Sequence, residues 1–275
     1  MLNFIFFSLF IHLAIGALLP LLFISQREIG PTFFRFSSGL SVIFFCLALL
    51  ARPFEALAAD SSFTIAKMAI TATLSLVTLN IFVLFFGSIF LKQLGKSFLY
   101  AAFGLGLVTL VLVSSFYPVS SGLAQPPFWM RALSFVGSSL ALGSVLAAMV
   151  TGHWYLVNRK LTIQPLRLAT LLFLGTIFFR IIFVAALMLY LNFSNESLMS
   201  ETAQALLKFS GKGMLFWTRV AIGLFGPLVF GLMIYETVRL RSTQSATGIL
   251  YATVVFVFIG ESFSKFIWFF TGIPI

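Results

Sequence analysis

Four polar residues lie within apolar runs where a charge or an imidazole is expensive to bury. Arg180 occurs in LGTIFFRIIFVAAL, Glu261 and Lys265 occur in VFVFIGESFSKFIWFF, and His12 occurs in FFSLFIHLAIG. A charge at the centre of a bilayer costs about 2.5–3.5 kcal/mol on insertion scales, so such residues usually face inward and pair. We therefore predict an Arg180–Glu261 ion pair across two helices. Lys265 follows Glu261 at the spacing i,i+4, which favours a second pair.

These residues allow two interpretations. In the first, the charges only join two helices. In the second, Arg180, Glu261, Lys265 and His12 line a polar binding site at mid-membrane for a quinone, a lipid head group, an ion or a proton. Because buried charge in a membrane is costly and often functional, we adopt the second interpretation as the working hypothesis.

The sequence offers no set of ligands for a haem or a transition metal. A haem held by two histidines needs both imidazoles at nearly the same depth, because each iron–nitrogen bond is only about 2 Å long. His12 and His153 are the only histidines, and their predicted depths differ by about ten residues, roughly 15 Å. Cys46 is the only cysteine. We expect no metal site, which leaves quinone as the one cofactor class considered.

Catalytic residues are also hard to assemble. No Ser-His-Asp set, no pair of catalytic carboxylates and no complete phosphate loop can be built from the sequence. Whether the chain is an enzyme stays open, and at most it would be the quinone-reacting subunit of an oxidoreductase.

The stretch GHWYLVNRK contains the second histidine beside two aromatic residues and two cations. Trp and Tyr favour the boundary between membrane and water, and Lys and Arg there meet lipid phosphates. We interpret it as an interfacial anchor, with contact to a ligand head group as the alternative. The anchor residues are His153, Trp154, Tyr155, Arg159 and Lys160.

The composition shows what kind of protein positions these residues. Of 275 residues, 60% are hydrophobic and 9% are charged, and 36 phenylalanines outnumber the 17 Lys and Arg plus seven Asp and Glu. A chain this apolar is solvated mainly by lipid, so its net charge of +10 indicates lipid phosphate and not nucleic acid. We predict an all-α transmembrane bundle of about eight helices in a single domain, 1–275. The predicted spans are 3–25, 33–51, 63–90, 97–117, 130–157, 166–191, 214–238 and 247–271.

The distribution of cations predicts the orientation, because cytoplasmic connections carry an excess of Lys and Arg. The connections after the first, third, fifth and seventh spans hold nine: Arg27, Arg35, Lys92, Lys96, Arg159, Lys160, Arg167, Arg239 and Arg241. The other connections and their flanks hold six: Arg52, Lys67, Arg131, Lys208, Lys212 and Arg219. Both termini are therefore predicted on the outer side of a cell membrane, which we expect to be a bacterial inner membrane.

Two local patterns predict details of the bundle. Leu198, Thr202, Leu206 and Phe209 recur at helical spacing, which indicates a short amphipathic helix on lipid or on a partner, or alternatively a lid. Pro227 lies inside the span 214–238 and should interrupt or kink it.

The segment RSTQSATGILYATVVFVFIGESFSKFIWF resembles the last helix of eight-helix quinol-reacting membrane anchors of the polysulfide- and dimethyl-sulfoxide-reductase type. GHWYLVNRKLTIQPLRL is similar to bacterial multi-helix membrane proteins without an assigned activity. The first resemblance implies a haem-free subunit that reacts with quinone inside a larger complex. It assigns no functional role to any individual residue of this chain.

Two functional hypotheses follow. The first is an integral membrane subunit of a redox or assembly complex, surrounded by lipid and bound to other membrane or peripheral subunits. The second is a small permease for an ion, a proton or an apolar metabolite. The two halves of the chain show no convincing repeat, which weakens the case for an inverted-repeat carrier.

Overall fold

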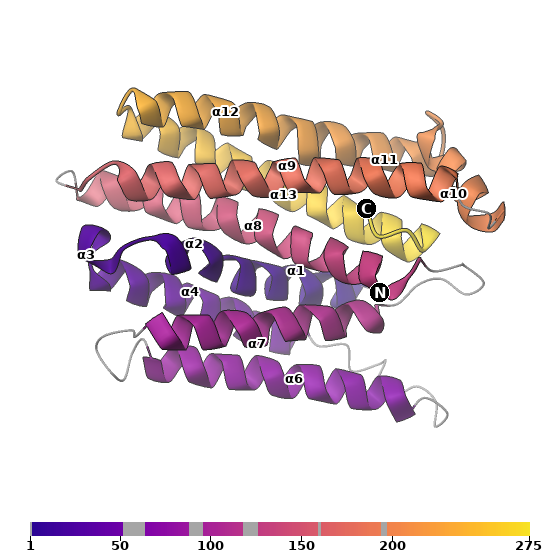
Figure 1. Ribbon diagram of the computed structural model, residues 1–275, viewed down its shortest axis with the longest axis horizontal. Coiled ribbons are helices and arrows are strands. Elements are labelled where there is room, and N and C mark those ends of the chain that lie inside the picture. The colour runs from indigo at the N-terminus through magenta and orange to yellow at the C-terminus, as the bar shows by residue number, and fades with distance from the viewer. Residues whose placement is uncertain (1, 52–63, 88–95, 118–125, 159–160, 194–196) are drawn as a thin grey trace.

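The computed structural model describes all residues except 1, 52–63, 88–95, 118–125, 159–160 and 194–196 (Figure 1). Its described residues form long helices that run side by side as one elongated bundle. The elements are α1 (Leu2–Gly16), α2 (Leu18–Phe23), α3 (Gln26–Ile29), α4 (Pro31–Leu50), α6 (Thr64–Phe85), α7 (Lys96–Ser115), α8 (Phe128–Val157), α9 (Gln164–Asn192), α10 (Ser197–Leu207), α11 (Lys212–Val220), the π-helical turn η2 (Ala221–Phe225), α12 (Gly226–Arg239) and α13 (Thr243–Thr271).

Seven stretches of helix in the described residues are long and apolar enough to cross a membrane. They correspond to seven of the eight predicted spans, and their ends lie within a few residues of the predicted ones. The remaining prediction, 63–90, coincides with α6, whose described apolar part, Thr71–Phe85, is shorter. The all-α polytopic bundle is confirmed, and the number of spans is close to the predicted eight.

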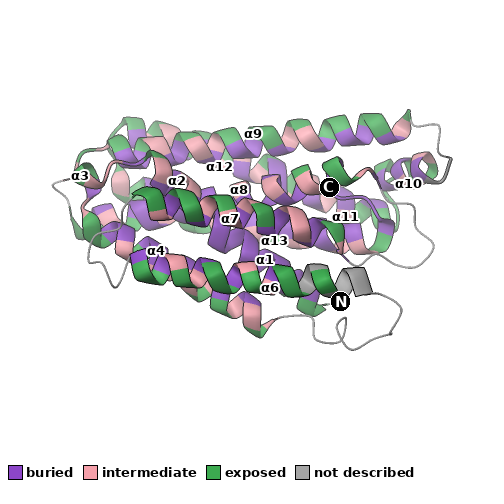
Figure 2. Cartoon of the chain, turned by 60° about the horizontal axis from the view of Figure 1, so that its bottom comes forward, coloured by how far each residue is buried: buried purple, intermediate pink, exposed green. Residues whose placement is uncertain are grey.

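Helices α1 and α8 form the centre of the bundle. In each of these two spans 78% of the apolar window is buried, against 28–39% in the other five. Helix α8 contacts α1, α7, α9 and α13, whereas α6 and α12 lie at opposite edges. Figure 2 shows exposed residues recurring along the outer sides of α6 and α9. Those sides would face lipid, because they carry large apolar residues such as Phe82 and Phe178.

Glycine allows α1 and α8 to touch backbone to backbone. A Cβ atom at Gly16 would lie 1.8 Å from the carbonyl oxygen of Ser139, and one at Gly143 would lie 1.9 Å from the carbonyl carbon of Gly16. Small residues commonly permit such contact between membrane helices, where dispersion and polar contacts hold the helices together. The hydroxyl of Ser139 also donates to the carbonyl oxygen of His12 at 3.0 Å.

The predicted seventh span is interrupted, as expected from Pro227. Helix α11 ends at Val220, the wider π turn η2 follows, and α12 begins at Gly226 with Pro227 in its first turn. Pro has no backbone N–H to donate, and π turns inside helices often occur at functional sites. This turn changes the direction in which α11 presents its side chains.

The predicted amphipathic helix exists as α10, but its apolar side covers the protein itself. Met199, Ala203 and Leu206 are buried in an apolar cluster with residues of α9 and α11. Phe209, which was expected on the same side, is exposed and stacks on Trp217 with 4.9 Å between ring centroids. Met199, Ala203 and Leu206 of α10 therefore serve internal packing. The side chain of Leu198 lies outside the described residues.

Both termini lie at one end of the bundle, which we call the terminal end; α3 lies at the other, the far end (Figure 1). The cation bias predicts that the far end is cytoplasmic. We expect reporters fused after residues 160 and 240 to be cytoplasmic, and a reporter after residue 210 to be external. External activity of the first two fusions would contradict this orientation.

Candidate functional site

The predicted pair between Arg180 of α9 and Glu261 of α13 is present. The guanidinium donates through Nε to Oε1 at 3.3 Å and through Nη2 to Oε2 at 3.1 Å. Neither side chain is exposed beyond 1%. Such a two-point contact between planar groups fixes orientation as well as distance. It holds α9 and α13 in register deep inside the bundle.

A second arginine, Arg219 of α11, shares the same carboxylate. Its Nη2 donates to Oε1 of Glu261 at 2.6 Å, and its side chain is fully buried. The prediction that Arg219 is one of the cations flanking an external connection is therefore wrong, because its side chain is buried among helices. Its removal from the external set strengthens the bias toward a cytoplasmic far end.

Lys265 departs from the predicted geometry because it does not pair with Glu261. Its Nζ donates to the hydroxyl of Ser138 on α8 at 3.1 Å. The ammonium also lies 4.4 Å from the ring centroid of Phe135 and 5.7 Å from that of Trp268. Aromatic faces attract a cation through their quadrupole. The hydroxyl of Ser138 and the rings of Phe135 and Trp268 therefore contact Lys265 in place of the expected carboxylate.

His12 lies beside these groups without a hydrogen bond. Its ring meets the ring of Phe135 edge-on with 4.8 Å between centroids, and neither imidazole nitrogen has a partner. The ring is fully buried. Phe135 therefore contacts both His12 and Lys265. The four predicted site residues thus come together at one depth, and Arg219 joins them.

Serine hydroxyls complete this group, which we call the charged cluster: Arg180, Arg219, Glu261, Lys265, Ser134, Ser138 and Ser264. Arg180 donates through Nη1 to Ser134 at 3.3 Å and through Nη2 to Ser138 at 3.0 Å. Ser264 Oγ is 3.5 Å from the same Nη2. These residues come from α8, α9, α11 and α13. The cluster lies toward the terminal end, since Glu261 is ten residues, about 15 Å, from the end of α13.

Two facing glycines leave the space through which the side chain of Arg219 reaches Glu261. A Cβ atom at Gly223 of η2 would lie 2.4 Å from Nη1 of Arg219 and 2.4 Å from Cα of Gly260. A Cβ atom at Gly260 would lie 2.2 Å from Cα of Gly223. The helices therefore touch through glycine, and the guanidinium fits over this contact. Sequence could have revealed it, because Gly260 directly precedes Glu261 and Gly223 follows Arg219 by one turn.

Gly260→Ala should break the Arg219–Glu261 contact. The added methyl group cannot fit against Gly223, so α13 must move away from η2, at a cost of about 1–3 kcal/mol. We expect a lower melting temperature in detergent. Gly248→Ala on the same helix is the control, because a Cβ there meets nothing within 4 Å. Equal melting temperatures for the two variants would contradict this close approach.

An apolar groove approaches the cluster from the lipid side. It holds about 270 Å³ between α8 and α9, with Leu133 and Leu187 in its walls and Trp129 and Tyr190 among its lining residues. Leu133 precedes Ser134 of the cluster, and Phe183 in the opposite wall has its ring centroid 6.0 Å from the guanidinium carbon of Arg180. Residues in the walls of the groove therefore adjoin Ser134 and Arg180, while no residue of the cluster lines the groove itself.

The predicted interfacial anchor lies at the far end, at the end of α8. His153 is exposed and its Nδ1 is 2.9 Å from the hydroxyl of Tyr251. Trp154 packs against Phe33 and Phe36 of α4 at centroid distances of 5.7 and 6.1 Å. Arg159 and Lys160 lie outside the described residues.

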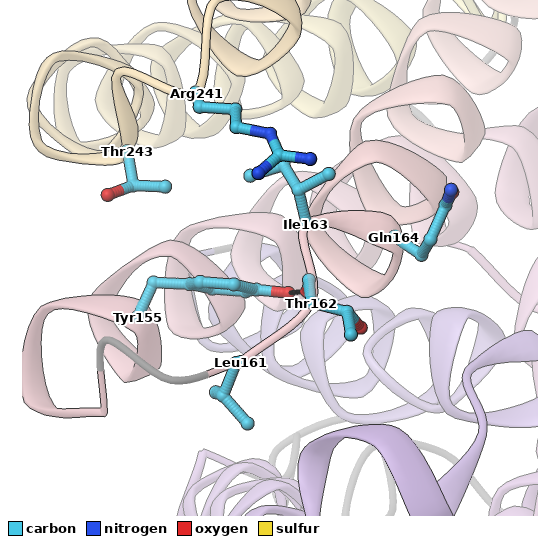
Figure 3. Close-up of a pocket in the computed structure, with 7 residues that line it drawn as sticks. All are labelled: Tyr155, Leu161, Thr162, Ile163, Gln164, Arg241 and Thr243. Atoms are coloured by element: carbon cyan, nitrogen blue, oxygen red, sulfur yellow. Dashed lines mark hydrogen bonds between the residues drawn. The ribbon is translucent and has the colours of Figure 1, made fainter.

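Tyr155 points into the protein and not toward lipid. It is 3% exposed, and its hydroxyl donates to the backbone oxygen of Thr162 (Figure 3). It borders a recess of about 630 Å³ between the α8–α9 connection and the start of α13, where Arg241 also lies. In this position Tyr155 ties the connection to α8, so it does not act as an anchor in the lipid interface.

No group of three or more His, Cys, Asp and Glu side chains suited to a metal occurs among the described residues. No protein-family profile matches the chain, and no curated protein matches its sequence significantly. The functional interpretation therefore rests on the charged cluster and on the apolar groove whose walls adjoin it.

Proposed function

We propose that this protein is an integral membrane subunit of a larger redox or assembly complex, and that the charged cluster binds the polar head of a quinone or a lipid. The observation that carries the proposal is the placement of buried donors beside a groove open to lipid. We further propose a bacterial inner membrane as its location, with both termini outside.

The shape of the groove suits an amphiphilic ligand. Its walls are apolar, so a hydrocarbon or prenyl chain between α8 and α9 would lose no hydrogen bonds. The inner end of such a chain would meet Ser134 and Arg180, which can donate to a carbonyl or phosphate oxygen. A head group there would strengthen contacts that already join α8, α9 and α13.

The proposal is tested by purifying the tagged chain from its native membrane in a mild detergent. We expect a cytochrome, iron–sulfur or assembly subunit to co-purify in stoichiometric amount. We also expect an organic extract to contain about one quinone or specific lipid per chain. A chain that purifies alone and without such a ligand would contradict it.

A permease is the second candidate, and the placement of Lys265 and His12 favours it. Both are titratable, fully buried and without a carboxylate partner. Buried protonatable groups of this kind occur in proton-coupled carriers. Proteoliposomes containing only this chain would distinguish the two candidates, because flux through the isolated chain would favour the permease over the subunit.

A further inference from the structure

A second recess at the far end, which we call the far recess, is lined by two cations from separate parts of the chain. It holds about 540 Å³, and its lining residues are Ser25, Gln26, Arg27, Pro31 and Lys96. Gln26 and Arg27 belong to the short helix α3, whereas Lys96 is the first residue of α7. Ligand pockets commonly hold about 300–1,000 Å³, so the far recess is large enough for a small ligand.

Neither cation of the far recess has a negatively charged partner. Arg27 and Lys96 are both exposed, and none of the ion pairs formed by the described residues includes either of them. Glu28 follows Arg27 in the sequence but is not among the residues that line the recess. Two unpaired cations thus border the same open volume.

The uncharged polar side chains of the far recess also include donors that lack an acceptor. Ser25 precedes α3, and its hydroxyl makes no capping hydrogen bond to that helix. The Nε2 atom of Gln26 is buried and has no acceptor in the described part of the chain. A buried donor without an acceptor is unfavourable. Because Gln26 borders the recess, a change of its side-chain rotamer would bring this donor to a ligand there. A phosphate group suits such a site, since it carries negative charge and several acceptor oxygens.

The far recess lies at the ends of three membrane spans. The first span ends at Phe23, just before Ser25, and two further spans begin at Pro31 and Lys96. The ends of apolar spans lie beside the head groups of the bilayer. The cation bias predicts that this end is cytoplasmic, and basic pockets between helices on that side bind anionic lipid head groups. The recess is therefore at the depth where lipid phosphates occur.

We propose that the far recess binds a phosphate group, held by Arg27 and Lys96 and carried by an anionic lipid or by a small soluble phosphate compound. The planar guanidinium of Arg27 can donate to two phosphate oxygens at once, and the ammonium of Lys96 adds a point charge. Such a ligand would tie α3 to the start of α7. The site is separate from the charged cluster, which lies toward the terminal end, so this inference goes beyond the proposed function.

The binding test uses the purified chain in an uncharged detergent, with melting temperature and dissociation constant as readouts. Dioleoylphosphatidylglycerol is the lipid probe, dioleoylglycerol has the same chains without the phosphate, and inorganic phosphate is the soluble probe. We expect phosphatidylglycerol to raise the melting temperature and to bind about tenfold or more tightly than dioleoylglycerol. Inorganic phosphate that binds as tightly as phosphatidylglycerol, or more tightly, would instead assign the site to a small soluble anion.

Two substitutions and a matched control connect binding to the far recess. Arg27→Gln and Lys96→Gln should each weaken the phosphate probe about fivefold, which is the factor that one cation contributes near a lipid surface. The double variant should weaken it about tenfold or more. Arg167→Gln is the control and should leave the affinity unchanged, because Arg167 is an exposed cation near the start of α9 at the same end and does not line the recess. Since all three residues are exposed, we expect the ligand-free melting temperatures to match that of the parent. The single variants carry the test if the double variant does not fold.

Each other result has a definite meaning. If phosphatidylglycerol binds no better than dioleoylglycerol and inorganic phosphate does not bind, the phosphate ligand is overturned. If Arg167→Gln weakens binding as much as Arg27→Gln, the general positive charge of the far end explains the binding, and the specific site is overturned. Binding that survives unchanged in the double variant lies elsewhere on the protein and also overturns this site. All of these outcomes leave the proposed function standing, because its own test is the co-purification of partner subunits.

Discussion

Glu261→Gln is expected to destabilise the protein more than any other single substitution in the charged cluster. The change leaves Arg180 and Arg219 buried together without their shared carboxylate. Breaking a buried ion pair by removing one partner costs about 3–5 kcal/mol, and here two pairs are lost at once. We expect little folded protein in detergent extracts and a much lower melting temperature for what remains.

Arginine substitutions give this prediction its controls. Arg180→Ala should cost less than Glu261→Gln, because Glu261 keeps its 2.6 Å contact with Arg219. The double variant Arg180→Ala with Glu261→Ala should recover only part of the yield, since Arg219 is then unpaired. Adding Arg219→Ala should recover more. If Glu261→Gln and Arg180→Ala both fold like the parent, the ion pairs do not stabilise the protein and the site assignment fails.

The same series separates structure from function. If the cluster only joins helices, the recovered triple variant should still assemble with its partners and bind ligand as the parent does. If it is a binding site, the triple variant should fold but lose binding, because both arginine donors of the cluster are gone. The measurements are the amount of quinone or lipid that co-purifies with each variant and its folded yield.

Gly16→Ala is expected to have the second largest effect, through the crossing of α1 and α8. The methyl group would lie 1.8 Å from the carbonyl oxygen of Ser139, which is backbone and cannot turn aside. The helices must separate, which we expect to cost about 3 kcal/mol or more. The separation would also lengthen the 3.0 Å bond from Ser139 to the carbonyl oxygen of His12 and disturb the packing of His12 on Phe135.

Gly143→Ala should behave similarly, because its Cβ would lie 1.9 Å from the carbonyl carbon of Gly16. Gly104→Ala on α7 is the matched control, since a Cβ there meets nothing within 4 Å. Replacing glycine by alanine in a helix stabilises by up to about 1 kcal/mol where space allows. The control should therefore keep or raise the melting temperature. Opposite behaviour of Gly16→Ala and Gly104→Ala would thus confirm the contact, and equal behaviour would contradict it.

Sequence alone predicted that the chain is an all-α membrane bundle and where its apolar helices begin and end. Length and hydrophobicity decide this, because a span needs enough apolar residues to cross the hydrocarbon. The same reasoning placed Arg180 and Glu261 at similar depths on two helices, since each residue along a helix advances a known distance. Depth and chemical type were therefore readable from the residues themselves.

The tertiary structure decided which side chains actually meet. Lys265 has the correct spacing for Glu261 but turns to Ser138 and Phe135 of α8. Arg219 looked like an interfacial cation, yet the Gly223–Gly260 contact beside η2 lets it reach Glu261. Tyr155 lies among residue types that are typical of a membrane interface, but its side chain turns inward and donates to the backbone oxygen of Thr162. The physical reason is that sequence gives the position of a residue along its helix, whereas the rotation of each helix and the identity of its neighbours depend on how all the helices pack.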